Sequence, residues 1–209
     1  MEIYLKMNFI DKTYVINLDK RQDRLANISA ELYGYDIDFE RWPATEHENG
    51  IIGLLESMKG LLRDAISKRY LNVMVLEDDA HFLASPKPFL ESVFPQLPGD
   101  YHLFYLGLNL ISRPTRLSEN ILKVNSAYST HSIVYSRAGM ELTLAELEKG
   151  ETIPFDILLM HRLQTLQKCY CTYPMLCTQT LSYSDIEKSH DRDWGKLMRV
   201  TYAMHTKNI

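Results

Sequence analysis

Cysteine is scarce in this chain, and long apolar runs are missing. Only three cysteines occur in 209 residues, Cys169, Cys171 and Cys177, and no fourth cysteine could complete two pairs. This count, without a convincing secretory segment, favours a reducing compartment, so we expect a cytoplasmic protein with these thiols in its core. No apolar run approaches the roughly 20 residues that span a bilayer, and we expect no transmembrane segment.

An excess of charge of either sign is also missing. The formal net charge is −4 and the pI is about 6.0, which gives no support to a generic nucleic-acid binder. Apolar residues make up 45% of the chain, as in ordinary globular proteins, and no repeat or low-complexity linker divides it. We therefore expect one domain over residues 1–209, with a core at about 13–190 and a tail at 191–209.

Strand-like and helix-like segments alternate along the chain. Patterns typical of strands fall at residues 13–18, 37–42, 73–76, 102–107, 122–124, 132–135 and 169–173. Apolar residues at helical spacing occur at 25–32, 54–66, 140–147 and after Pro154, and Ser136 can cap the third of these helices. Four prolines between 86 and 98 indicate a loop. This alternation predicts an α/β fold with a mainly parallel central sheet and helices on both faces.

Residues 73–80, Val-Met-Val-Leu-Glu-Asp-Asp-Ala, combine a buried strand with an acidic end. Ligands of open α/β sheets bind beyond the carboxyl ends of such strands, where Glu77, Asp78 and Asp79 follow. Adjacent carboxylates repel one another, so a hard divalent cation suits them. The alternative is a solvated acidic turn.

A second polar stretch, residues 19–24, follows the first predicted strand and precedes a helix. In such βα units the helix N-terminus faces an anionic ligand, so Arg21 and Arg24 are candidates for contacts with phosphate or a nucleotide. A charged first helical turn with solvated arginines explains them equally well.

Several of these stretches follow one another in the order of known motifs. Residues 14–25 (YVINLDKRQDRL), 50–57 (GIIGLLES) and 73–80 resemble the first three motifs of glycosyltransferase family 25, the lipopolysaccharide and procollagen sugar-transferase family. Similar likenesses occur at 130–139 (THSIVYSRAG), at Pro154-Phe155-Asp156 and from Pro174 to Ile186. The chain departs from the family at Leu54 and Met58, where Cys and His are usual.

The resemblance implies a type A glycosyltransferase fold, a Rossmann-like sheet that binds a UDP-sugar with Mn²⁺ or Mg²⁺ on its diphosphate. Asp79 is the first candidate as metal ligand, with Asp78 as the second. The residues expected to bind the nucleotide-sugar are Asn17, Leu18, Asp19, Arg21, Arg24, Glu77 and Asp78. His131 and His190 are further candidates as a metal ligand or phosphate donor, although a lone histidine is more often structural.

The implied reaction moves a hexose, galactose or glucose, from a UDP-sugar to a hydroxyl of a glycan, lipid-linked or protein acceptor, with inversion. Such a hydroxyl needs a general base. Asp156, at a helix start where the dipole favours the ionised form, is the first candidate and Asp185 the second, and each also fits as an ordinary helix-terminal residue. A non-catalytic glycan- or nucleotide-binding scaffold on the same fold stays the alternative.

The tail combines apolar residues near helical spacing with scattered lysines and arginines. The favoured interpretation is a terminal helix that packs on the domain. Peripheral docking on a membrane surface is the alternative. It is less favoured, because a short basic stretch by itself binds a membrane only marginally.

Overall fold

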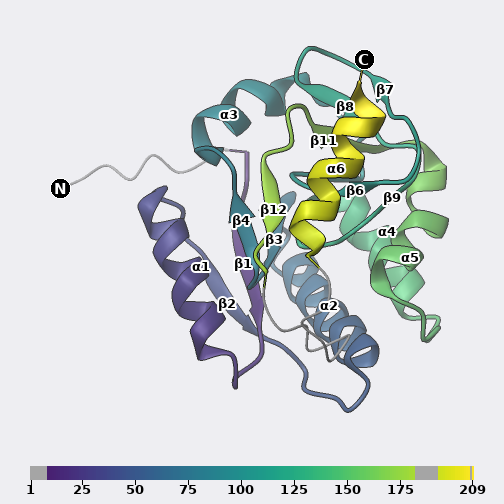
Figure 1. Ribbon diagram of the computed structural model, residues 1–209. Helices are drawn as coiled ribbons and strands as arrows, with labels where there is room; N and C mark the ends of the chain where they lie inside the picture. The colour runs from purple at the N-terminus through teal and green to yellow at the C-terminus, as the bar shows by residue number, and fades with distance from the viewer. Residues whose placement is uncertain (1–8, 182–192, 208) are drawn as a thin grey trace.

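The computed structural model describes residues 9–181, 193–207 and 209, and its centre is an eight-stranded sheet (Figure 1). The spatial order of the strands is β2 (Glu40–Pro43), β1 (Lys12–Asn17), β3 (Asn72–Glu77), β10 (Ser132–Ser136), β5 (Leu103–Tyr105), β11 (Cys169–Thr172), β8 (Ile121–Lys123) and β7 (Thr115–Arg116). Strands β2, β1, β3, β5 and β11 run in one direction, and β10 lies antiparallel between β3 and β5. The predicted α/β fold with a mainly parallel sheet is therefore confirmed.

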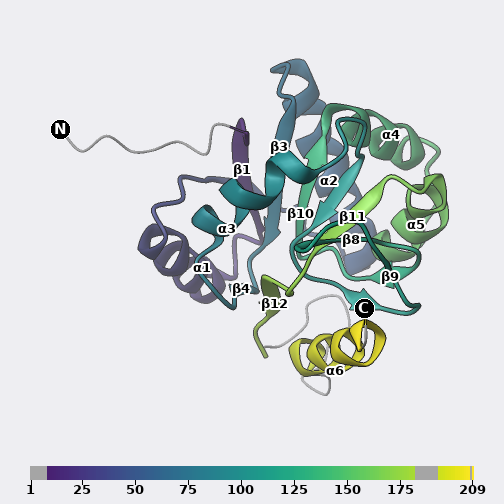
Figure 2. The same cartoon turned by 90° about the horizontal axis from the view of Figure 1, so that it is seen from above.

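Helices cover both faces of the sheet, as the alternating strand pattern requires (Figure 2). In β1, Tyr14 and Ile16 join one apolar core while Val15 joins the other. The first core packs against α2 (Gly50–Ser67), α4 (Arg137–Leu147), α5 (Phe155–Arg162) and α6 (Trp194–Thr206). The second core packs against α1 (Gln22–Gly34) and α3 (Pro86–Val93). Two-sided burial explains why β3 has no polar residue between Asn72 and Glu77.

The prediction of a loop over residues 86–98 is wrong. Residues Pro86–Val93 form helix α3, and a short 3-10 helix follows at Phe94–Gln96. Pro86 and Pro88 lie in the first turn of α3, where a backbone N–H has no acceptor within the helix. Leu90 and Val93 then pack in the second core. The prolines are therefore compatible with the start of the helix, and burial of its apolar residues stabilises it.

Two short strand pairs lie outside the main sheet. Strand β4 (Ala80–Phe82) pairs with β12 (Cys177–Gln179), and β6 (Asn109–Leu110) pairs with β9 (Ala127–Tyr128). In the first pair Gln179 lies opposite Ala80, directly after the acidic residues. These strands have only two or three residues, too few to show a periodic pattern in the sequence.

Helix α6 lies against β6 and β12, and its Met198 and Tyr202 are buried. All three cysteines are buried and free of disulfides, as expected for core thiols. None of the helices in the described part of the chain is both long enough and apolar enough to cross a membrane.

Candidate functional site

A pocket of about 680 Å³ opens where β1 and β3 end. This volume lies within the usual range for sites of small molecules and cofactors. Its lining comes from residues 16–18, 20, 24, 44–47, 50–51, 53–54, 57, 77–79, 128–130, 154–157, 179–180 and 194. The pocket therefore draws on the loops after both strands and on the starts of α2, α5 and α6.

The chain topology places this pocket at a switch point of the sheet. Strand β1 lies between β2 and β3 and is parallel to both, with Ile16 opposite Glu77. The chain leaves β1 through α1 on one face, and returns to β3 through α2 on the other. In open α/β sheets such a divergence leaves a crevice at the carboxyl ends of the strands, where ligands bind.

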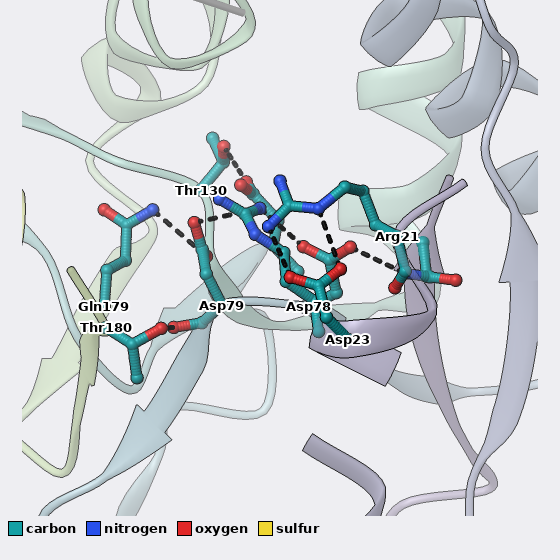
Figure 3. Close-up of polar contacts among 10 residues, drawn as sticks. Arg21, Asp23, Asp78, Asp79, Thr130, Gln179 and Thr180 are labelled. Carbon is teal, nitrogen blue, oxygen red and sulfur yellow. Dashed lines mark hydrogen bonds and ion pairs between the residues drawn. The ribbon is translucent and has the colours of Figure 1, made fainter. Parts of the chain in front are cut away.

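The Asp78 carboxylate forms several of the polar contacts that are drawn as dashed lines in Figure 3, with partners from the end of β1 and from the first turn of α1. The Asn17 side-chain amide donates a hydrogen bond of 2.7 Å to Asp78 Oδ2, and Arg24 Nη1 donates one of 2.7 Å to Oδ1. Arg41 Nε in turn donates to Asn17 Oδ1 at 2.9 Å and so orients the amide. Asp78 is buried, and these charge-assisted bonds offset the cost of its burial.

Asp79 and Glu77 flank Asp78 in the chain and are only partly exposed to solvent. Arg24 Nη1 lies 3.5 Å from Asp79 Oδ2, and Gln179 Nε2 donates to Oδ1 at 3.3 Å. Burial raises the pKa of Asp79, and the Arg24 charge opposes this rise. Burial and the neighbouring Asp79 charge raise the pKa of Glu77, which accepts a hydrogen bond of 2.7 Å from the Thr130 hydroxyl. Three carboxylates beside one guanidinium make this end of the pocket attractive to a further cation.

Asp156 lines the same pocket from the first turn of α5. Its Oδ1 accepts a hydrogen bond of 2.8 Å from the Ile157 N–H, and its Oδ2 lies 3.4 Å from the Ser129 backbone nitrogen. These donors stabilise a carboxylate that faces the cavity. A pocket that contains both the acidic strand end and a separate carboxylate can bind a charged group and accept a proton beside it.

The structure brings most of the predicted site residues together. Seven of them line the pocket: Asn17, Leu18, Arg24, Glu77, Asp78, Asp79 and Asp156. Asp19 forms an ion pair with Arg41 and Arg21 forms one with Asp23 at 2.9 Å, and neither Asp19 nor Arg21 lines the pocket.

The remaining candidates are Asp185, His190 and His131. Asp185 and His190 lie outside the described residues. His131 is fully buried away from the pocket lining, and burial lowers its pKa to about 4.

Sequence reasoning missed several lining residues, among them Lys20, Thr130, Gln179 and Trp194. Thr130 and Gln179 occur in the motif-like stretches, but no spacing rule connects them with Glu77 and Asp79, which lie far earlier in the chain. Their positions depend on the pairing of β10 with β3 and of β12 with β4.

The chemistry of these side chains fits a hard divalent ion, although no group of three or more His, Cys, Asp or Glu residues in the described ranges could hold a metal by itself. Asp78 and Asp79 both line the pocket, and the carboxylates of both lie near the same nitrogen, Arg24 Nη1. Mg²⁺ is usually bound by one or two carboxylates and by phosphates of the substrate, so two carboxylates suffice when a diphosphate supplies further oxygens.

Comparisons with known proteins add a likeness of fold. No protein-family model matches the chain, and neither does any curated protein. Among solved structures, the chain is similar to the crystal structure of A197 from STIV, with a TM-score of 0.50, 15% identity and coverage of 85% of this chain and 92% of that one. The likeness is one of fold. Weaker similarities are found to mannose-1-phosphate geranyltransferase from Thermus thermophilus (TM-score 0.41, 10% identity, 77% and 73% coverage) and to UDP-glucose pyrophosphorylase complexed with UDP-glucose (TM-score 0.46, 8% identity, 92% and 81% coverage).

Proposed function

We propose that this protein is a glycosyltransferase of the family 25 type that moves a hexose, galactose or glucose, from a UDP-sugar to a hydroxyl acceptor with inversion. The acceptor is a glycan, a lipid-linked saccharide or a protein side chain. The observation that carries the proposal is the joining of Asn17 and Arg24 with residues 77–79 in one pocket at the sheet's switch point. Such a combination can hold a nucleoside diphosphate with a metal ion and stabilise the charge that develops as the diphosphate departs.

The donor diphosphate is assigned to the end of the pocket formed by Lys20, Arg24 and the acidic residues. Asp78 and Asp79 would hold Mn²⁺ or Mg²⁺, with His190 as a further candidate ligand. The ion would supply positive charge to the leaving diphosphate. Arg24 would bind a phosphate oxygen, and Asn17, held by Arg41, would keep Asp78 in position.

Asp156 is assigned as the general base. Its carboxylate takes the proton of the acceptor hydroxyl as that oxygen bonds to the anomeric carbon, while the bond from this carbon to the UDP oxygen breaks. Asp156 lines the same pocket as the acidic cluster but comes from a different element, the first turn of α5. Asp185 is the second candidate for this role.

A cytoplasmic location completes the proposal, and peripheral membrane docking through α6 is the alternative to a helix that only packs on the domain. Leu197, Val200 and Met204 are exposed at a spacing of three and four residues along α6, with Lys196 and Arg199 next to them. An apolar stripe with basic neighbours suits an anionic lipid surface. Three buried free thiols agree with a reducing compartment.

Donor turnover tests the proposal. The purified protein is incubated with UDP-galactose or UDP-glucose, with Mn²⁺ or with a chelator, and release of UDP is measured with and without saccharide acceptors. We expect metal-dependent UDP release that an acceptor stimulates. UDP binding without any turnover of either donor would instead support the non-catalytic scaffold.

A further inference from the structure

Arg24 occupies a position between the two carboxylates that are proposed to bind the metal ion. Its Nη1 atom lies 2.7 Å from Asp78 Oδ1 and 3.5 Å from Asp79 Oδ2. The side chains of Arg24, Asp78 and Asp79 expose only 13%, 9% and 13% of their surface, so solvent screens these ion pairs poorly. The positive charge of one guanidinium therefore lies close to the negative charges of both carboxylates.

A divalent ion on these carboxylates competes with this arrangement. Such an ion lies about 2.1 Å from its oxygen ligands, which puts two positive charges close to the present position of Arg24 Nη1. Like charges at this separation repel strongly where water is scarce. Asp78 Oδ2 is also engaged, because Asn17 donates to it at 2.7 Å. The ion and the guanidinium therefore compete for the same carboxylate oxygens.

We propose that Arg24 is an exchangeable counter-cation, which neutralises Asp78 and Asp79 before a metal ion binds and moves to a phosphate of the donor when it does. The proposal rests on the proposed function, since it needs a diphosphate in the pocket. A planar guanidinium is suited to both partners, because it forms directed hydrogen bonds to carboxylates and to phosphates. Arg24 lies in the first turn of α1 and lines the pocket, so its side chain can reach an anion there.

Cooperative binding of metal and nucleotide follows from this exchange. Without a nucleotide, the ion has to displace Arg24 from Asp78 and Asp79, and the guanidinium gains no phosphate in return. With a diphosphate in the pocket, the displaced guanidinium gains a new anionic partner. UDP should therefore raise the affinity for Mn²⁺, and Mn²⁺ should raise the affinity for UDP by the same factor.

The decisive experiment is a calorimetric titration with Mn²⁺ of the wild-type protein and of Arg24→Gln, each with and without saturating UDP. Without UDP we expect Arg24→Gln to bind Mn²⁺ about tenfold more tightly, because the competing cation is gone. With UDP the two proteins should bind Mn²⁺ about equally, so the coupling factor falls about tenfold in the variant. UDP itself should bind the variant more weakly, because a phosphate contact is lost.

Arg21→Gln is the matched control. Arg21 lies three residues before Arg24 and pairs with Asp23 outside the pocket lining, so the control removes one positive charge from the same turn. We expect it to bind Mn²⁺ as the wild type does. Arg24→Lys serves if the glutamine variant fails to fold, because a lysine keeps the charge but is too short to bridge both carboxylates, and Mn²⁺ should bind it several-fold more tightly.

The outcomes separate this proposal from the proposed function. The exchange would be overturned if the wild type and the Arg24 variants bound Mn²⁺ equally well without UDP. If the wild type still bound UDP in a metal-dependent way, the transferase proposal would stand. Absence of Mn²⁺ and UDP binding in the wild type would overturn both. Tighter Mn²⁺ binding in the variants with weaker UDP binding would support the exchange.

Discussion

At the scale of single residues, the chemistry that remains to be tested depends most on Asp156. Replacing it with asparagine preserves its shape but removes the proton acceptor, so we expect turnover to fall by about 10²-fold or more while UDP affinity stays near that of the wild type. Steady-state kinetics combined with nucleotide titration would measure both quantities. Asp23→Asn is the control, because Asp23 also lies in a first helical turn but pairs with Arg21 and does not line the pocket.

Two results would contradict this assignment. If Asp156→Asn abolishes UDP binding, the residue holds the donor instead of the acceptor proton. If the turnover number is unchanged, Asp185 becomes the next carboxylate to substitute.

His131 contributes to a different property, the dependence of the free energy of unfolding on pH. Its ring is fully buried, and burial lowers its pKa from 6.5 to about 4. Between about pH 6.5 and pH 4, the His131 ring is therefore protonated in the unfolded chain but neutral in the folded chain. Stability is therefore lost as the pH falls through this window, by about 3 kcal/mol at most from this residue.

Urea unfolding between about pH 7 and pH 4 would measure this contribution. We expect His131→Gln to lose stability less steeply than the wild type over this range, whatever its stability at neutral pH. Parallel curves for the two proteins would show that His131 is protonated equally in the folded and unfolded states.

At the scale of elements, the contact between α4 and the sheet leaves no room for a side chain at Gly139. A Cβ atom there would lie 2.0 Å from the His102 carbonyl oxygen, and the Ser136 hydroxyl caps α4 by accepting from the Gly139 N–H at 3.1 Å. Gly139→Ala should therefore lower the free energy of unfolding by about 3 kcal/mol or more, since backbone would have to move. Gly34, the last residue of α1, has no atom within 4 Å of the equivalent position. Gly34→Ala should be neutral or stabilise by up to about 1 kcal/mol.

Denaturant unfolding of the two variants compares a close contact with an open position. If the two substitutions changed the free energy of unfolding equally, helix propensity would explain the change, and the close approach of α4 to the backbone at His102 would not.

At the scale of the whole molecule, ligand binding should appear as a change in global stability. A ligand at about 100 times its dissociation constant stabilises the native state by about 2.7 kcal/mol if the unfolded chain does not bind it. For a protein of this size UDP with Mn²⁺ should raise the melting temperature by roughly 5 to 11 °C, and UDP alone by much less. Thermal scans with UDP and other nucleoside diphosphates would measure this.

Asp79→Ala refines the same measurement. The variant should lose most of the metal-dependent shift and still fold without ligand, because removal of one crowded carboxylate relieves repulsion around Glu77 and Asp78. An equal shift with and without Mn²⁺ in the wild type would contradict a metal-bridged diphosphate.

Local patterns in the sequence were enough to predict the α/β class, most strands and the placing of acid after a buried strand. Residues 73–79 are informative because burial on both faces requires a continuous apolar run, which ends where the carboxylates begin. Ser136 was likewise predicted as a helix cap, since its hydroxyl needs only a backbone N–H three residues away. Interactions of this range are encoded within a few neighbouring residues.

Only the tertiary structure decided which distant groups share the pocket. Arg24 meets Asp78 because β1 and β3 are parallel neighbours, Thr130 reaches Glu77 because β10 pairs antiparallel with β3, and Gln179 reaches Asp79 through β12. Strand order and register depend on how all the helices pack on both faces, and no local pattern contains this information. The sequence therefore determined that acid would stand at the end of a buried strand, and the fold decided that a guanidinium would lie between two of its carboxylates.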